Sequence, residues 1–355
     1  MTIQKIVTVC AVVFASVLSS LALPTRADDQ WVTYAGGEGA SKGKSIVFVS
    51  GDEEYRSEEG LPMLAKLLAK NHGFKCTVLF AVDEKTGEIN PNNGGNIPGL
   101  AALDTADLMV ILTRFRHLPE DQMKHIDDFL MAGKPVIGLR TATHAFDGMK
   151  GIYEKYNNGY KGSVEGWTDG FGRAVLGEKW ISHHGNHMRE STRGVFAPDA
   201  SGDPVLTGIK DGEIWGSTDV YGVRLPLPDT CKVLVLGQVC KATARKIDTD
   251  PDYGMQPTDE ALPATDKKNN PMMPIAWTKH YQLPGGKPGR SLTTTMGAST
   301  DLANEGLRRL LVNAALDLTG LKVPEKADVT IVGDYKPNAY RGNGFTKGVK
   351  PSDLK

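Results

Sequence analysis

The stretch Ser45-Ile-Val-Phe-Val-Ser50 decides the fold class, because a continuous apolar run is followed almost at once by a helical pattern. Residues 57–70 repeat apolar side chains at helical spacing, among them Leu61, Leu64 and Leu68. A strand that is apolar on both faces is typical of a parallel sheet covered by helices. This unit therefore predicts an α/β domain.

The same alternation continues along the chain, with one long interruption. Further strands are expected at residues 76–82, 108–113, 136–140, 233–237, 274–277 and 291–296, and further helices at 120–131 and 301–318. Between the strands at 136–140 and 233–237 the pattern lapses into a segment rich in Gly, Trp and His. The sequence predicts a central, mostly parallel sheet with helices on both faces and a long loop-rich insertion, at about 147–230.

The first residues are typical of a secretory signal. Lys5 precedes an apolar run at 6–21, and small residues lead to Ala27, so we expect a signal peptide at 1–27. The run is short for a membrane span, which needs about 20 apolar residues. We expect export to the periplasm or the extracellular space; the alternative is a retained N-terminal anchor.

The rest of the chain divides by composition. A lead at 28–43 is followed by the α/β domain at 44–322, and residues 323–355 are expected to form a C-terminal tail that wraps around it. The formal net charge is −1, without a basic cluster, so neither a nucleic acid nor, after signal cleavage, a membrane is an expected partner. A small, weakly charged or neutral molecule is favoured, and a homo-oligomer remains open.

The cysteines do not indicate a thiolate metal site. Cys10 would leave with the signal, and the remaining Cys76, Cys231 and Cys240 cannot all pair within one chain because their number is odd. Cys231 and Cys240 could bridge neighbouring strand segments, whereas Cys76 lies in an apolar run and is expected to be buried. No C-x-x-C spacing occurs, and no G-x-G-x-x-G follows the first strand, so neither thiolate-bound zinc nor a dinucleotide is expected.

Polar residues crowd the ends of three expected strands. In open α/β sheets, ligands bind beyond the carboxyl ends of the strands. The candidates at these ends are Asp52, Glu53, Arg56, Arg114, Arg140, Thr141, Thr143 and His144. We therefore expect a site at this edge, with Glu53 and His144 as candidates for catalysis and the others as candidates for substrate binding.

A second polar stretch, Ile181-Ser-His-His-Gly-Asn-His-Met-Arg-Glu-Ser-Thr-Arg193, carries three of the eight histidines. His183, His184 and His187 are candidate general acids or bases, oriented by a carboxylate. A divalent metal is an alternative, held by His183 and His187 with Glu53 or His144; a third reading is a solvated polar scaffold. Further substrate-binding candidates are Arg189, Arg193, Trp215, Asp219 and Tyr221, the last three because an aromatic face beside a carboxylate suits a sugar. Tryptophan is also ordinary core filler.

Several motifs together resemble the secreted branch of the ThuA-like, trehalose-utilisation family. They are Gly51-Asp-Glu-Glu-Tyr-Arg-Ser-Glu-Glu59, Leu139-Arg-Thr-Ala-Thr-His-Ala-Phe146, His183-His-Gly-Asn-His187, Ser191-Thr-Arg-Gly194, Trp215-Gly-Ser-Thr-Asp-Val-Tyr221, Ala276-Trp-Thr-Lys279 and Thr293-Thr-Thr-Met-Gly-Ala298. The resemblance covers residues 44–321 and implies a class I glutamine-amidotransferase-like, flavodoxin-like fold and a link to sugar catabolism. The segment through 348–353 looks like an extension found with this branch.

One departure from the amidotransferases bears on the chemistry. Their strand-to-helix elbow carries a cysteine nucleophile, and the corresponding turn at 138–143 has none, so glutaminase activity is not expected. Thr141 or Thr143 could serve as a nucleophile with His144 nearby. Arg140 is expected to grip a substrate oxygen with its forked donors, or else to pair with Asp52 or Glu53.

Two functions of different kinds follow. The first is an exported enzyme of sugar metabolism that acts on a (keto-)sugar or disaccharide by acid/base chemistry, through isomerisation, elimination or hydrolysis. The second is a noncatalytic carbohydrate-binding protein that has kept the fold. No cofactor is expected beyond the alternative of a divalent metal.

Overall fold

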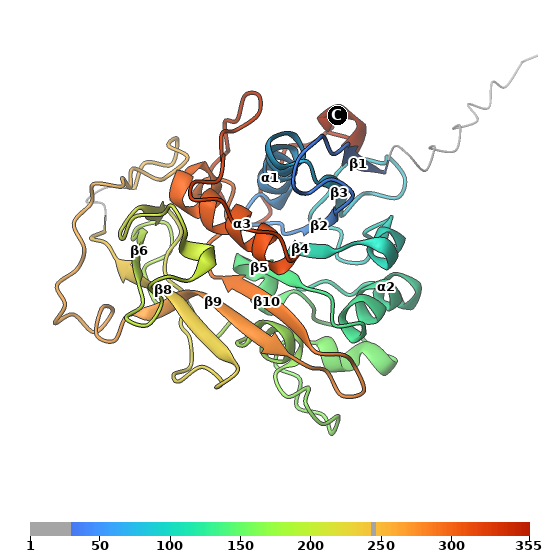
Figure 1. Ribbon diagram of the computed structural model, residues 1–355, viewed down its shortest axis with the longest axis horizontal. Coiled ribbons are helices and arrows are strands. Elements are labelled where there is room, and N and C mark those ends of the chain that lie inside the picture. The colour runs from blue at the N-terminus through green and yellow to red at the C-terminus, as the bar shows by residue number, and fades with distance from the viewer. Residues whose placement is uncertain (1–29, 243–245) are drawn as a thin grey trace, which may run out of the picture.

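The structure, a computed structural model, describes residues 30–242 and 246–355. One ten-stranded sheet runs through these residues in the order β1-β3-β2-β4-β5-β10-β9-β8-β6-β7 (Figure 1). The predicted signal peptide at 1–27 lies outside the described residues. Among the helices of the described ranges, none has the length and hydropathy that a membrane span requires.

One half of the sheet, which contains the strand predicted from Ser45-Ile-Val-Phe-Val-Ser50, is parallel. Its strands are β3 (Lys75–Phe80), β2 (Ser45–Gly51), β4 (Leu108–Thr113), β5 (Val136–Leu139) and β10 (Gly289–Thr294). Each lies within two residues of a strand predicted from its apolar run. All five strands point the same way, so their carboxyl ends meet at one edge.

The other strands are antiparallel, so the prediction of a mostly parallel sheet is wrong. They are β1 (Trp31–Tyr34) at one edge and β9 (Met273–Tyr281), β8 (Cys231–Val239), β6 (Thr192–Phe196) and β7 (Ile214–Gly216) beyond β10. An apolar run is the same in either strand direction, whereas the connections decide it. Residues 282–288 between β9 and β10 are too few for a crossover helix, which a parallel pair needs.

Helices cover both faces of the sheet, as expected. The α-helices are α1 (Ser57–His72) and α3 (Glu305–Leu318) on one face and α2 (Glu120–Met131) on the other. Short helical turns are η2 (Leu100–Thr105), η3 (Arg140–His144), η4 (Gly151–Tyr156), η5 (Gly172–Leu176), η6 (Pro204–Leu206), η7 (Asp301–Ala303) and η8 (Pro351–Leu354). The helix predicted at 301–318 begins later because the Asn304 side chain caps it, accepting from Leu307 N at 2.9 Å.

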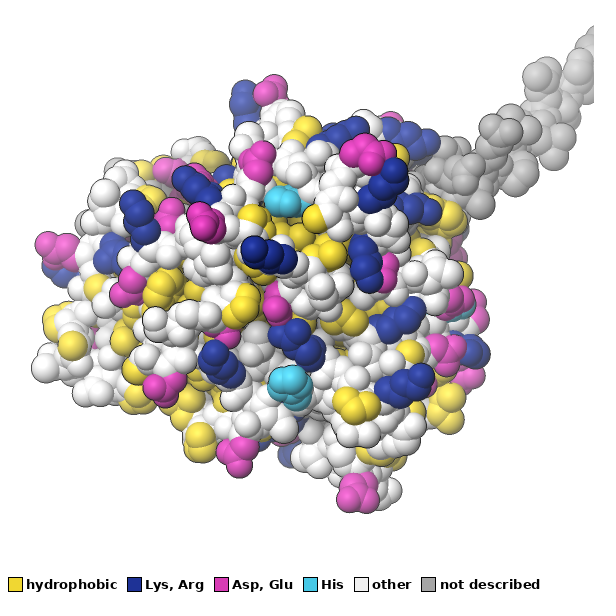
Figure 2. Space-filling view, viewed as in Figure 1, with side chains coloured by type: hydrophobic (Ala, Val, Ile, Leu, Met, Phe, Trp, Pro, Cys, Tyr) yellow, Lys and Arg dark blue, Asp and Glu magenta, His cyan; other side chains and the backbone are white. Residues whose placement is uncertain are grey.

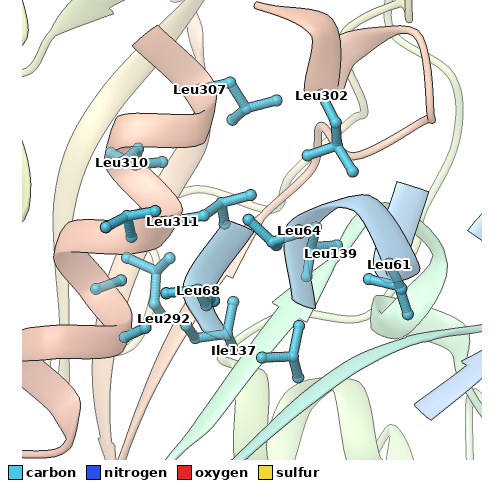
Figure 3. Close-up of a cluster of buried hydrophobic side chains, with 14 of the residues drawn as sticks. Leu61, Leu64, Leu68, Ile137, Leu139, Leu292, Leu302, Leu307, Leu310 and Leu311 are labelled. Carbon is cyan, nitrogen blue, oxygen red and sulfur yellow. The ribbon is translucent and has the colours of Figure 1, made fainter. Parts of the chain in front are cut away.

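Leucines from α1, α3 and the central strands form the core between the helices and the sheet (Figure 3). Leu64 and Leu68 of α1 meet Leu310 and Leu311 of α3 above Leu292 of β10. Full burial of one leucine contributes roughly 1.5–3 kcal/mol, so this layer fixes α1 and α3 on the strands that carry the site.

The insertion and the tail both bind back onto the sheet. The insertion is not all loop: it supplies β6 and β7, and His183 forms an isolated bridge with Tyr221. The tail passes α1, where Asp328 O lies 2.6 Å from a ring nitrogen of His72, and reaches β1, where Leu354 O accepts from the Tyr34 hydroxyl at 2.7 Å. Both segments therefore have fixed positions near the sheet.

The three cysteines of the described residues are free. Cys231 begins β8 and Cys240 directly follows it, so nine residues of extended chain separate them. At about 3.3 Å per residue they are too far apart for a disulfide. The suggested bridge between them is therefore excluded. Cys76 is buried, as expected.

Candidate functional site

A buried arginine joins the parallel strands to the insertion. Arg140 is the first residue after β5, in the left-handed region with φ 43°, and its side chain is fully buried. Nη1 donates to Asp219 O and Thr295 O, both at 2.7 Å, and Nη2 donates to Asp219 Oδ1 at 2.7 Å and to the Tyr55 hydroxyl at 3.2 Å. Its guanidinium carbon lies 3.6 Å from the ring centre of Tyr221. Arg140 thus ties together the loops after β2, β5, β7 and β10.

Arg140 therefore does not take the role predicted for it. A fully buried guanidinium held by protein oxygens cannot grip a substrate, and it pairs with Asp219 rather than with Asp52 or Glu53. It lies in the tight turn that directly follows β5. The strained backbone there aims the side chain beneath the site, so Arg140 is a positioning residue.

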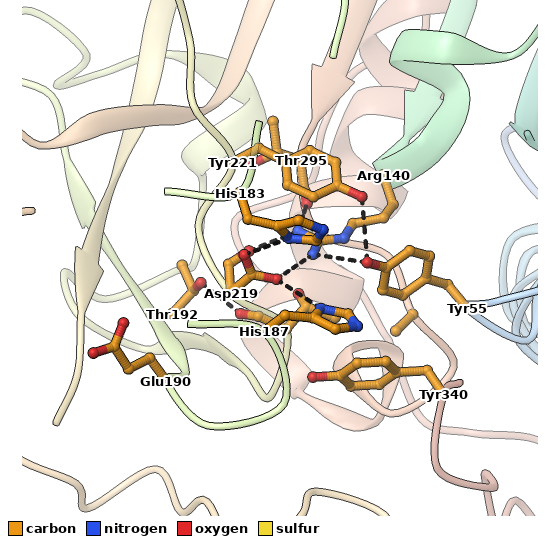
Figure 4. A network of polar contacts seen from close by, with 12 residues as sticks. Tyr55, Arg140, His183, His187, Glu190, Thr192, Asp219, Tyr221, Thr295 and Tyr340 are labelled. Carbon is orange, nitrogen blue, oxygen red and sulfur yellow. Dashed lines mark hydrogen bonds and ion pairs between the residues drawn. The ribbon is translucent and has the colours of Figure 1, made fainter. Parts of the chain in front are cut away.

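Asp219 is the centre of the network (Figure 4). Its side chain is fully buried; Oδ1 accepts from Arg140 and from His187 Nδ1 at 3.2 Å, and Oδ2 accepts from His183 Nδ1 at 2.8 Å. Burial alone would raise the pKa of Asp219, but Arg140 and the two histidine hydrogen bonds hold it below its usual value. Asp219 is therefore ionised and only accepts hydrogen bonds.

The two histidines on Asp219 differ in their second nitrogen. His187 Nε2 lies 3.1 Å from Glu54 Oε1, so both ring nitrogens face carboxylates. Burial would lower the pKa of His187, but the hydrogen bonds that it donates to Asp219 and Glu54 raise it. Two acceptors require two N–H donors, so His187 is held as the imidazolium.

His183 is the more accessible of the pair, with 38% of its side chain exposed. Since Asp219 can only accept, Nδ1 carries the proton, and in the neutral ring Nε2 has the lone pair. Within residues 30–242 and 246–355, no hydrogen-bond partner faces Nε2. This nitrogen is available to exchange a proton with a ligand.

His144 lies behind His183 in an aromatic layer. Its ring centre is 5.0 Å from Phe115, 5.4 Å from Trp180 and 6.3 Å from Tyr221. Burial, followed by nearby positive charges, lowers the pKa of His144 well below its usual value, so the ring is neutral. Its Nδ1 lies 3.2 Å from Thr143 Oγ1, which itself donates to Arg140 O at 3.1 Å.

This geometry argues against a threonine nucleophile. The Thr143 hydroxyl donates its hydrogen bond to Arg140 O, so it accepts from His144, and the ring nitrogen that faces it does not act as a base. The Thr141 hydroxyl donates to Asp52 Oδ2, and both groups are fully buried. These residues fix the turn after β5.

The remaining acidic candidates have structural partners. Glu53 forms ion pairs with Arg114 and, at 2.9 Å, with Arg116. Asp52 Oδ1 accepts from the backbone of Glu54 and Tyr55 at 2.7 and 2.5 Å, which closes the turn before α1. Burial, together with the neighbouring Glu53, raises the pKa of Asp52 to about 6. The carboxylate of this turn that reaches a histidine is that of Glu54, which contacts His187.

Several predicted residues lie outside the network. His184 Nε2 lies 2.9 Å from Lys268 O, Arg193 donates to Pro257 O and Asp259 O, and Arg189 is exposed with no side-chain hydrogen bond in the described ranges. Arg56 lines a separate pocket. Trp215 is 7% exposed and donates to Ser191 Oγ, so it is core rather than a sugar platform.

Sequence reasoning missed four residues that complete the site. Glu54 and Tyr55 lie in the polar strand exit that had been singled out, but only the turn geometry shows that Glu54, not Glu53, points to His187. Tyr340 stacks on Tyr55 at 5.3 Å and comes from the tail, where no sequence signal marked it. Trp180 is half-buried with its ring centre 5.9 Å from His183, so it is the accessible aromatic face that Trp215 is not.

One group in the described residues could hold a metal. Ligand atoms of His183, His187 and Asp219 lie within 4.8 Å of one another. Two imidazoles and a carboxylate suit zinc and similar ions. The third member is Asp219, not Glu53 or His144, because Glu53 is occupied by arginines and His144 is buried among aromatic rings. A metal here would have to replace the hydrogen bonds that now join both histidines to Asp219.

Comparisons with known proteins give distant likenesses. No family model and no curated protein matches the sequence. Two similar solved structures are titled putative ThuA-like proteins. That from Bacteroides uniformis has 11% identity and a TM-score of 0.45, covering 83% of this chain and 98% of its own; that from Parabacteroides merdae has 14% identity and a TM-score of 0.45, covering 85% and 99%.

A third solved structure, titled as a cytoplasmic protein from Salmonella typhimurium, has 12% identity and a TM-score of 0.39 over 79% of this chain and 99% of its own. The first two titles name the family that the sequence motifs resemble. Likenesses this distant do not assign an activity, which rests on the geometry above.

Proposed function

We propose that the protein is an exported enzyme of sugar metabolism that moves a proton on a (keto-)sugar or disaccharide, with His183 as the general base and acid. The observation that carries the proposal is the 2.8 Å hydrogen bond from His183 Nδ1 to the ionised, buried Asp219. It fixes the ring and leaves Nε2 on the accessible side, as proton transfer requires. A class I glutamine-amidotransferase-like, flavodoxin-like arrangement of the parallel half belongs to the same proposal.

Each neighbour of His183 has a part in this chemistry. Asp219 stabilises the imidazolium that forms when Nε2 takes a proton, and Arg140 and His187 keep Asp219 charged and in place. Trp180 offers a face against which a sugar ring can pack. Arg114, 28% exposed and 3.6 Å from Glu54, is the accessible cation for negative charge that develops on a substrate oxygen.

In a keto-sugar, Nε2 would take the proton from the carbon beside the carbonyl, leaving an enediolate. Return of the proton to the former carbonyl carbon, while the proton of the adjacent hydroxyl moves to the former carbonyl oxygen, gives the isomer. Loss of a β-substituent that takes the proton from the His183 imidazolium as it leaves gives the elimination product. Glutaminase activity is no part of the proposal, because the turn at 138–143 has no cysteine.

The test is hydrogen exchange into candidate sugars in D₂O, followed by NMR, across a panel of keto-sugars and disaccharides. We expect His183→Ala to slow exchange and turnover by roughly 10²- to 10⁴-fold with little loss of folding stability, because the side chain is exposed. His184→Ala is the matched control, since its ring bonds to Lys268 O away from Asp219. Equal loss in both variants would contradict the proposal.

The alternative, a noncatalytic carbohydrate-binding protein, is favoured by one observation: Arg140, His187 and Glu53 are all held in internal pairs. That function predicts sugar binding with no exchange, and affinity that Trp180→Ala weakens while His183→Ala does not. The same titrations and exchange spectra therefore separate the two functions.

Export is proposed on the N-terminal sequence alone. The mature chain is expected to begin after Ala27, which N-terminal sequencing of protein secreted by its own cell would verify. A chain that begins at Met1 and stays with the membrane fraction would instead indicate the retained anchor.

A further inference from the structure

A polar pocket lies beside the site but apart from its histidines. It has a volume of about 630 Å³, in the range of ligand pockets. Its walls come from the start of α1, the tail and the segment after residue 245. The lining includes Arg56, Met188, Lys246, Tyr253, Asn338 and Arg341.

Positive charge in this pocket exceeds negative charge. Arg56, Lys246 and Arg341 contribute cations, and Asp248 is the carboxylate among the lining residues. Asp248 is paired with Lys246 at 2.8 Å. Arg341 is exposed, and in the described part of the chain its guanidinium forms no ion pair or hydrogen bond. Two guanidinium charges thus remain to attract an anion.

Arg56 is buried and yet incompletely bonded. It is 6% exposed; Nε donates to Ala339 O at 3.2 Å, whereas Nη1 has no hydrogen-bond partner in the described ranges. The nearest carboxylate oxygens belong to Glu58 at 3.8 Å and Glu59 at 4.0 Å, both too far for a hydrogen bond. A buried donor left unpaired is costly. The Arg56 side chain also lines the pocket, so an oxygen that enters the pocket meets an incompletely bonded guanidinium.

Of the two nearby glutamates, Glu58 does not neutralise Arg56, and Glu59, 4.0 Å away, balances its charge only in part. Burial raises the pKa of Glu58 to about 8, so Glu58 is uncharged at neutral pH. Glu59 directs its oxygens to Asn338, accepting from the backbone N at 2.9 Å and from Nδ2 at 2.8 Å. The start of α1, which follows Arg56 directly, adds the positive end of a helix dipole.

We infer that this pocket binds the carboxylate or phosphate group of a small anionic molecule, with Arg56 and Arg341 as its ligands. Guanidinium forks match the paired oxygens of both groups. Tyr253 and Met188 give the pocket an apolar wall for the body of the ligand. Figure 2 shows basic and acidic side chains interspersed over the visible face, with no large area of one sign; the inference rests on the local excess of charge among the pocket residues.

Short contacts connect the pocket to the histidines. Met188 follows His187 in the chain, Arg341 N donates to Glu54 O at 2.9 Å, and the Tyr340 ring centre lies 5.5 Å from that of His187. Binding itself does not depend on the proposed proton transfer, so it can be tested alone.

The test is isothermal titration of the whole mature chain with inorganic phosphate, with gluconate and, as an uncharged control, with glucose. We expect an anion to bind and its affinity to fall at least about tenfold in Arg341→Gln, which is about 1.4 kcal/mol. Arg341 is exposed, so this variant should fold. Lys347→Gln, which removes an exposed tail charge outside the pocket, is the matched control.

Tighter gluconate than phosphate would identify a carboxylate ligand, and the reverse would identify a phosphate ligand. Arg56→Gln should abolish either. The inference is overturned if neither anion binds, or if Arg341→Gln and Lys347→Gln behave alike. His183→Ala should leave anion binding unchanged, so failure of this inference and failure of the proposed enzyme are separate results.

Discussion

Two regions of the molecule each bury an arginine beside an acid, and the pKa of the acid shifts in opposite directions in the two. In the site network, Arg140 Nη2 donates to Asp219 at 2.7 Å, and the pKa of Asp219 falls despite burial. At the start of α1, Arg56 stays 3.8 Å from Glu58, and burial raises the pKa of Glu58 to about 8. Burial alone therefore does not fix the charge of an acid; a cation in direct contact, together with hydrogen bonds, decides it.

The difference has a structural origin. The backbone of Arg140 aims its guanidinium at two loops: the loop after β7 supplies the carboxylate and a carbonyl group of Asp219, and the loop after β10 supplies the carbonyl group of Thr295. Arg56 also has a positive φ, 59°, but its side chain runs along the tail and finds one carbonyl. Arg140 uses its donors to position Asp219, whereas Arg56 keeps donors for a ligand.

The largest effect is expected from removing Asp219, the partner of the buried Arg140. Asp219→Ala should cost about 3–5 kcal/mol of unfolding free energy, because it leaves Arg140 buried without its partner. The same change should abolish proton exchange, since His183 loses the group that orients it. Chemical denaturation and the D₂O assay measure the two effects.

Asp199→Ala is the control for this prediction, because Asp199 is exposed and its carboxylate bonds to no other described residue. Its stability should stay within about 0.5 kcal/mol of the parent. If Asp219→Ala were equally mild, Arg140 would have to be accessible to water, and the distinction between the two regions would disappear.

A pH titration of stability tests the second region, the start of α1 with Arg56 and Glu58. Glu58 keeps its proton in the folded state up to about pH 8, whereas the unfolded chain releases it near pH 4.5. Over that window the unfolded state binds fewer protons, so stability falls as pH rises. Glu58→Gln removes this loss and should make the protein more stable than the parent by about 4 kcal/mol at pH 8.

At pH 4.5 the parent and Glu58→Gln should differ by less than about 0.5 kcal/mol, because Glu58 is then protonated in the folded state and half protonated in the unfolded one. Asp52, Glu59 and Arg56 act on Glu58, and they are present in both proteins, so their own titration cancels in the difference. Glu59→Gln is the neighbouring control and should give no such slope. Parallel stability curves for the parent and Glu58→Gln would show that Arg56 is neutralised after all.

The strands were predictable because their signal is local. Apolar runs located all five parallel strands, and the rule that ligands bind at carboxyl ends brought Arg140 and the Asp52–Arg56 turn to one edge, where Arg140 does contact Tyr55. The direction of β8 and β9 was not predictable from their apolar runs. Nor was β6 or β7, since strands of five and three residues leave little pattern.

The partners within the site needed three-dimensional geometry. His183, Asp219 and Tyr221 were candidates from composition, but only the fold of the insertion makes Asp219 the shared acceptor of two histidines. Adjacent residues with the same chemistry, such as Glu53 and Glu54, differ in which way the turn points them. A tryptophan in a polar motif, Trp215, proved to be core, because it belongs to a buried cluster with Tyr55 and Tyr340, while Trp180 lies beside His183.

The smallest predicted effect concerns Tyr340, which lies between the two regions. Ala339 O accepts from Arg56, and the buried Tyr340 ring stacks on Tyr55, which in turn accepts from Arg140. The Tyr340 hydroxyl donates to Ser217 O at 2.8 Å, two residues before Asp219. Tyr340→Phe should therefore cost about 1 kcal/mol of stability and shift the loop that carries Asp219.

Tyr335→Phe separates these two consequences, because the Tyr335 hydroxyl also comes from the tail and donates to a carbonyl, Ser299 O at 2.7 Å, away from Asp219. Both variants should lose similar stability in denaturation, since each leaves one carbonyl without its donor. Only Tyr340→Phe should also slow proton exchange, by less than about tenfold, because Asp219 is still held by Arg140 at 2.7 Å. If the two variants exchange protons at the same rate, the tail only packs against the site. Any effect of the Arg56 region on the Arg140 network would then have to pass through Tyr55.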